Sequence, residues 1–158
     1  MHGVKLKIIG AHMTIKRIFG IIILLFVIIA TSANAADLCR EKADSALKNL
    51  KTWQDLRLWH ENYLACDDGY FAEGISDFVV RTLAKKWESL SALQSEIAKN
   101  TKFKDFVIKH IDATTDENQL EMVIENAKLK CPSKLQNLCN EIRNNAQTSL
   151  KEIKETTK

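Results

Sequence analysis

Apolar residues along most of the chain recur three or four positions apart, and no stretch alternates apolar and polar residues as a half-buried strand would. Five successive apolar stripes of this kind cover residues 36–50, 53–66, 70–87, 91–98 and 102–111. Another stripe follows Thr114, and the last begins at Leu135. The pattern predicts an all-α protein, a compact bundle of six or seven helices, whose last residues, 155–158, should fray.

Local signals mark where several of these helices begin. Thr52 followed by Asp55, and Thr114 followed by Glu117, have the spacing of a capping box, in which side chains satisfy free N–H groups of the first helical turn. Pro132 predicts a break before the last helix, because proline has no backbone N–H to donate.

The start of the chain has a different pattern. The basic pair Lys16 and Arg17 precedes an apolar run of 13 residues, 18–30, and small residues follow at Ala33 and Ala35. This order is typical of a secretory signal peptide, whereas a membrane-spanning helix needs about 20 apolar residues. The sequence therefore predicts export to the periplasm or beyond the cell.

We expect residues 1–35 to be removed as the signal peptide, which leaves residues 36–158 as one helical domain without stable membrane insertion. Four of the 23 basic residues and none of the 20 acidic residues lie in the leader, so the remainder has 19 basic against 20 acidic residues. A nucleic-acid-binding protein needs a net basic face. The near-neutral balance argues against that class of partner.

Four cysteines in an exported chain predict two disulfides, because thiols pair in an oxidising compartment. If residues 36–50 and 53–66 form an antiparallel hairpin, Cys39 and Cys66 lie at its open end and pair there. The remaining two cysteines then pair across the break at Pro132, although crossed pairings stay open. The four disulfide residues are Cys39, Cys66, Cys131 and Cys139.

No cofactor or metal site is predicted. The nearest cysteines are eight residues apart, wider than the usual zinc-binding pair. His60 and Glu61 begin like the zinc-protease motif H-E-x-x-H, but the second histidine is missing. We expect His60 to face solvent beside Trp59 and His110 to be a packing residue whose ring is satisfied.

The densest polar run extends from Asp67 to Asp77. Asp68, Glu73 and Asp77 are candidates for paired catalytic carboxylates, because the last two share a helix face. A plainer interpretation is that the aspartates favour the start of a helix and that Gly74 lets another helix approach closely. We favour a surface for a partner protein and assign no catalytic residue. The candidate partner-binding residues are Asp67, Asp68, Tyr70, Glu73, Asp77 and, where it is exposed rather than in the core, Trp59.

The run from Cys66 to Asp77, followed by the sequence Leu-Lys-Cys-Pro at 129–132, resembles small exported helical proteins of Gram-negative bacteria. It is also weakly similar to the Rap/Tai type of periplasmic immunity proteins of type VI secretion, through Gly69-Tyr70, Gly74 and the later cysteine. This resemblance implies a stoichiometric inhibitor that plugs the active site of a peptidoglycan-cleaving toxin.

Two functions follow as hypotheses. The first is an exported helical binding protein without catalytic activity, which is immunity-like if the resemblance holds. The alternative is a hydrolase of envelope polymers that uses carboxylates of residues 67–77. A hydrolase needs a concave site with opposed carboxylates, whereas a binding protein does not. The sequence sets neither the identity of a partner nor the oligomeric state.

Overall fold

The computed structural model describes residues 40–156. The predicted signal peptide, its cleavage site, Cys39 and the last two residues lie outside this range. The described residues form seven α-helices and no strand, which confirms the all-α prediction. The first helix covers residues 40–48 within the described range. The other elements are α2 (Trp53–Tyr63), η1 (Leu64–Cys66), α3 (Gly69–Lys85), η2 (Trp87–Ser89), α4 (Leu90–Lys99), α5 (Lys102–Lys109), α6 (Glu117–Leu129), η3 (Ser133–Leu135) and α7 (Gln136–Thr156).

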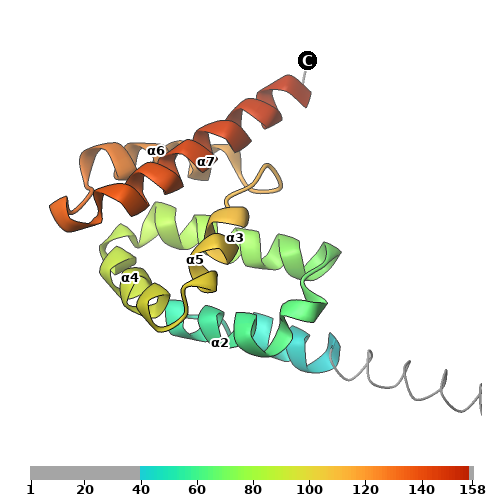
Figure 1. Ribbon diagram of the computed structural model, residues 1–158. Coiled ribbons are helices and arrows are strands. Elements are labelled where there is room, and N and C mark those ends of the chain that lie inside the picture. The colour runs from blue at the N-terminus through green and yellow to red at the C-terminus, as the bar shows by residue number, and fades with distance from the viewer. Residues whose placement is uncertain (1–39, 157–158) are drawn as a thin grey trace, which may run out of the picture. The chain divides into compact units, whose positions relative to one another are not determined.

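The helices pack around α3 (Figure 1). Helices α6 and α7 lie side by side, and α6 also packs on α3. On the other side of the core, α2 contacts α4 and α5, and the 40–48 helix reaches α3 through Leu47, which meets Gly74. A Cβ placed on Gly74 would lie 2.8 Å from Leu47 Cδ2. The prediction that this glycine permits a close helix approach is therefore confirmed.

Of the two predicted capping boxes, one is confirmed and one is wrong. Thr52 accepts from the backbone N–H of Asp55 at 3.1 Å, and the Asp55 carboxylate accepts from the Thr52 N–H at 2.9 Å. At α6 the N-cap is Asp116, whose carboxylate accepts from the Gln119 N–H at 2.9 Å. An aspartate stands directly before the helix and satisfies its first turn. Thr114 instead bonds to Asp112, two residues earlier.

The three tryptophans are core residues, and each indole N–H ties one element to another. Trp53 donates to Ser89 Oγ at 2.8 Å, Trp59 to a carbonyl of the 40–48 helix at 3.0 Å, and Trp87 to the Lys130 carbonyl at 3.0 Å. Trp59 is 1% exposed and packs between the rings of Phe71 and Phe106. It therefore offers no surface to a partner, which corrects its place among the candidate contacts.

The described residues contain one complete disulfide, Cys131–Cys139, with a Cα–Cα distance of 6.1 Å. As expected, Pro132 ends the preceding segment, so this bridge spans the entry to α7. The structure thus shows one of the two predicted disulfides. The Cys39–Cys66 bridge involves a residue outside the described range and stays a prediction.

The polar side chain of Asn126 joins α6 to the end of α3. Its amide donates to the carbonyl oxygens of Leu83 at 3.1 Å and Ala84 at 2.9 Å, and the residue is 5% exposed. These carbonyls lie in the last turn of α3, where no further helical N–H reaches them. The amide of Asn126 thus satisfies the C-terminal end of α3 inside the protein.

We predict that Asn126→Ala lowers the free energy of unfolding by about 2–3 kcal/mol, because two buried carbonyls lose their donor. The matched control is Asn118→Ala on the exposed side of the same helix, which should change it by less than about 0.5 kcal/mol. Urea unfolding followed by circular dichroism measures both. Equal stabilities of the two variants would contradict this role for Asn126.

Candidate functional site

The acidic run 67–77 divides between the surface and the interior. It covers the loop after η1 and the first half of α3, which begins at Gly69 with a φ of +40°, a conformation that favours glycine. Asp68, Glu73 and Asp77 are exposed, whereas the side chain of Asp67 is only 3% exposed. The segment therefore supplies an outward acidic surface and one inward carboxylate.

Tyr70 is the aromatic member of the outward surface. Its side chain is attached at the first turn of α3 and is 56% exposed. The phenol donates to Asp44 Oδ1 at 3.0 Å, and the other oxygen of Asp44 accepts from Lys48 at 2.5 Å. The hydrogen bond from Lys48 and, to a smaller extent, that from Tyr70 lower the pKa of Asp44. They also fix the orientation of an exposed ring, which lowers the conformational entropy that this side chain would lose in any contact.

The exposed acids continue along α3 as a ridge. Glu73, Asp77, Arg81 and Lys85 follow one another at intervals of four residues, so they lie on one side of the helix. Asp77 pairs with Arg81 at 2.9 Å, and both side chains are about half exposed. The ridge is acidic in its first half and basic in its second.

The inward carboxylate of Asp67 belongs to a buried polar cluster that sequence reasoning missed. Asp67 Oδ2 lies 3.0 Å from Lys109 Nζ and 3.3 Å from His110 Nε2. The other ring nitrogen, Nδ1, lies 3.0 Å from Ser76 Oγ, and that hydroxyl donates to Asp112 at 2.6 Å. The cluster fastens the end of α5 and the following turn to α3 and to the loop before it.

The serine, histidine and aspartate of this cluster have the composition of a hydrolase triad, but they differ from one in accessibility and in the direction of the serine proton. Ser76 is 0% exposed, so no substrate reaches its oxygen. Its proton is directed at Asp112, whereas a nucleophilic serine gives its proton to the histidine. The arrangement therefore stabilises the fold. It confirms that His110 is a packing residue whose ring nitrogens are satisfied.

Burial and hydrogen bonding both shift pKa values in this cluster. Desolvation of the His110 ring lowers its pKa, although the carboxylate of Asp67 acts in the opposite direction. For Asp112, burial acts to raise the pKa, but hydrogen bonds from Ser76 and Thr114 outweigh it, and the pKa is lowered. Burial of the ring and hydrogen bonding of the carboxylate thus move the pKa values of His110 and Asp112 in the same, downward direction.

The structure corrects the expectation that His60 faces solvent. His60 is 6% exposed, and its ring centroid lies 4.6 Å from that of Phe106, with the two ring planes tilted by 48°. Its Nδ1 has no hydrogen-bond partner among the described residues. His60 lies four residues after Leu56 and next to Trp59, so it falls on the same inward side of α2 as these two residues. Desolvation lowers the pKa of this histidine.

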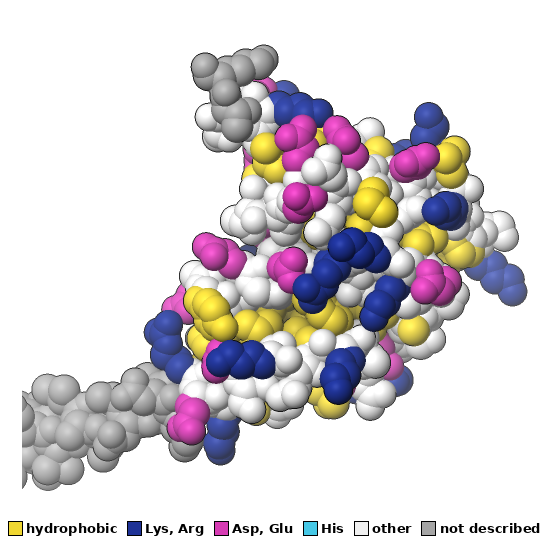
Figure 2. All heavy atoms as spheres, turned by 180° about the vertical axis from the view of Figure 1, so that it is seen from behind, with side chains coloured by type: hydrophobic (Ala, Val, Ile, Leu, Met, Phe, Trp, Pro, Cys, Tyr) yellow, Lys and Arg dark blue, Asp and Glu magenta, His cyan; other side chains and the backbone are white. Residues whose placement is uncertain are grey.

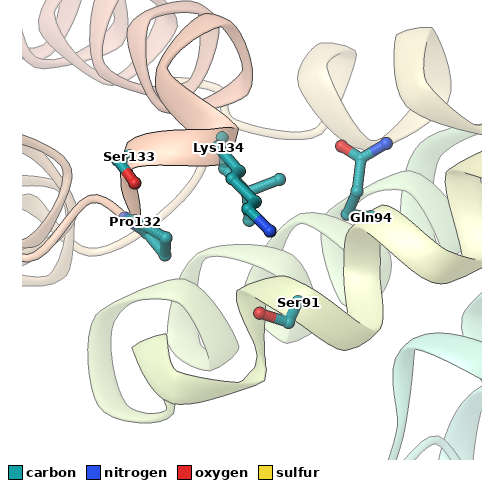
Figure 3. A pocket seen from close by; sticks show the side chains of 6 residues that line it. Ser91, Gln94, Pro132, Ser133 and Lys134 are labelled. Atoms are coloured by element: carbon teal, nitrogen blue, oxygen red, sulfur yellow. The ribbon is translucent and has the colours of Figure 1, made fainter.

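Among the described residues, no three His, Cys, Asp or Glu side chains gather closely enough to hold a metal ion. No helix of the described part is long and apolar enough to cross a membrane. A hollow of about 290 Å³ lies between α4 and η3 (Figure 3). Its lining offers hydroxyls, an amide and one ammonium, but no carboxylate or imidazole that could act on a substrate: Ser91, Gln94, Pro132, Ser133, Lys134 and Leu135.

Comparison with known proteins adds no neighbour: no family model, curated protein or solved structure matches the chain.

The two buried histidines predict a loss of stability on acidification. Both have lowered pKa values in the folded protein, so below about pH 6.5 the unfolded chain binds more protons than the folded one. The free energy of unfolding should fall as the pH is lowered from 7.5 to 5. His60→Phe should reduce this slope, because the phenyl ring keeps the packing against Phe103 and Phe106 and removes one titrating group.

His110→Phe is the contrasting variant. At pH 7.5 His60→Phe should lie within about 1 kcal/mol of the wild type, whereas His110→Phe should cost about 1–3 kcal/mol, because it leaves Ser76 and Asp67 short of a partner. Thermal and urea unfolding across this pH range measure both effects. Equal tolerance of the two substitutions would refute the cluster's role.

Proposed function

We propose that the protein is an exported binding protein without catalytic activity, and that the outward face of the first half of α3 contacts another protein. The observation that supports this proposal most strongly is that the polar groups are divided between the surface and the interior. Asp68, Tyr70, Glu73 and Asp77 stand outward, whereas Ser76 and His110, which have the chemistry for catalysis, are buried and bonded to each other.

The geometry favours binding over the hydrolase alternative. Two carboxylates that share the work of glycoside hydrolysis face each other across the substrate, about 5–10 Å apart. Glu73 and Asp77 instead lie one turn apart on the outer side of a single helix, and Asp77 is paired with Arg81. Five well-formed hollows of the described part have no carboxylate of residues 67–77 in their linings.

The exposed ring of Tyr70 and its acidic neighbours have the composition of a contact surface. Tyrosine supplies large contact area with little conformational entropy, and acidic side chains around it steer association toward a basic or metal-bearing surface. The resemblance to periplasmic immunity proteins suggests a toxin that attacks the cell envelope as the partner. Export is supported by the leader, and the Cys131–Cys139 bridge is compatible with an oxidising compartment.

Site-specific photo-cross-linking in the producing cells tests the proposed surface. A photoreactive residue at Tyr70 or Glu73 should form a discrete adduct with one envelope or toxin protein. The matched control is Met122, a residue of α6 that is 43% exposed and lies outside the proposed surface. Adduct formation at Met122 and none at Tyr70 or Glu73 would place the interface elsewhere.

A turnover assay tests the absence of catalysis. Purified protein incubated with peptidoglycan should release no soluble fragments above the rate of a buffer control. Release that is abolished by Glu73→Gln, with unchanged circular dichroism, would overturn the binding function in favour of the hydrolase.

A further inference from the structure

We propose that the hollow between residue 50 and the second half of α3 binds an acidic segment of a partner protein. One large apolar side chain of that segment enters the hollow, and carboxylates of the same segment flank that side chain. This inference rests on the proposed binding function and adds a second contact surface with its own chemistry.

The hollow, which we call the basic hollow, has a volume of about 220 Å³. Leu50, Phe78 and Thr82 contribute its apolar and hydroxyl-bearing part. Cationic side chains from two separate segments complete the lining: Lys51, Arg81, Lys85 and Lys86. Seen from behind, the molecule shows dark blue side chains gathered around a strip of hydrophobic atoms on the face that α3 shares with residues 40–51 (Figure 2).

Three of these four cations have no ion-pair partner among the residues that the structure describes. Arg81 pairs with Asp77, but Lys51, Lys85 and Lys86 are exposed and make no salt bridge there. Asp55, four residues after Lys51, is engaged by the capping box at the start of α2, and the charge of Lys51 acts on its carboxylate without forming a salt bridge. Elsewhere in this part of the chain many lysines do have carboxylate partners, among them Lys48, Lys99, Lys104, Lys109, Lys151 and Lys154.

A plainer explanation for lysines at this position is the end of α3, where basic side chains favour the negative end of the helix dipole. The carbonyls there already have other donors, however. Asn126 donates to those of Leu83 and Ala84, and the Lys86 backbone N–H donates to that of Thr82 at 2.8 Å. The helix end does not require the ammonium groups, and it does not explain Lys51, which comes from a different segment.

The chemistry of the hollow selects its occupant. Cations on opposite sides of one site repel each other, so an anionic ligand relieves this repulsion. The apolar part favours a side chain that leaves water, and its volume suits one large residue rather than a broad hydrophobic helix face. An acidic segment with a single apolar side chain satisfies both requirements. The acidic first half of α3 then remains available for a basic region of the same partner.

Synthetic peptides test the basic hollow directly. The probe is a fluorescein-labelled 13-residue peptide with two glutamates on each side of one phenylalanine, in a glycine and serine background. We expect saturable anisotropy changes with full-length mature protein, and amide shifts in NMR spectra at Leu50 and Phe78. Lys85→Glu combined with Lys86→Glu should weaken binding at least tenfold. The matched control, Lys128→Glu on the exposed side of α6, should leave it unchanged.

Companion measurements separate the alternatives. The peptide with glutamine in place of glutamate, and that with serine in place of phenylalanine, should each bind at least tenfold more weakly. Equal binding of either peptide, or of the double variant, overturns the proposal.

Binding to phosphatidylglycerol vesicles without peptide binding also overturns the proposal, because it identifies a lipid site. A salt-sensitive dimer in sedimentation that the double variant disrupts identifies a second copy as occupant. These readouts do not depend on cross-linking at Tyr70, so the proposed function can fail or hold separately.

Discussion

Helix α3 is buried along most of its length, and each polar group that this burial removes from water needs a partner inside the protein. Ser76 forms hydrogen bonds with Asp112 and His110, and carbonyls in the last turn of α3 accept hydrogen bonds from Asn126. These bonds come from the turn after α5 and from α6, so they set where both segments stand. Leu47 closes a further side of the helix, because Gly74 leaves room for it. One ridge of α3 remains for solvent.

The functional account follows from this division. Ser76 and His110, which have the chemistry for catalysis, hold α3 in place. The charge of the exposed side chains changes sign along the ridge. Glu73 and Asp77 come first, and Arg81 and Lys85 follow. Charges held on a buried helix keep their spacing, so the partner that we propose would meet a preformed pattern, and little entropy would be lost in ordering it. Such a surface suits recognition better than turnover.

Much of this architecture could be predicted from local sequence. The helices, the Thr52 capping box and the break at Pro132 each depend on residues within a few positions of one another. The close approach at Gly74 was predicted from the glycine alone, although its neighbour, Leu47, lies in another helix. The buried cluster could not be predicted, because Ser76 and His110 are 34 positions apart and no spacing rule links them. Likewise, the inward position of Asp67 depends on Lys109 and His110, which lie 42 and 43 positions away in the sequence. His60 was predicted wrongly because its residue type was given more weight than its position four residues after Leu56, which places it on the side of α2 that α5 covers.

The central claim is that the exposed acids of α3 recognise a partner protein without catalysing a reaction. The most direct test is the association kinetics between the mature protein and the partner that is cross-linked at Tyr70, compared for wild type and the double variant Glu73→Gln with Asp77→Asn. The account predicts unchanged circular dichroism, slower association at low salt and a smaller difference at high salt, because exposed charges act mainly on the encounter. Identical association rates at every salt concentration would contradict it.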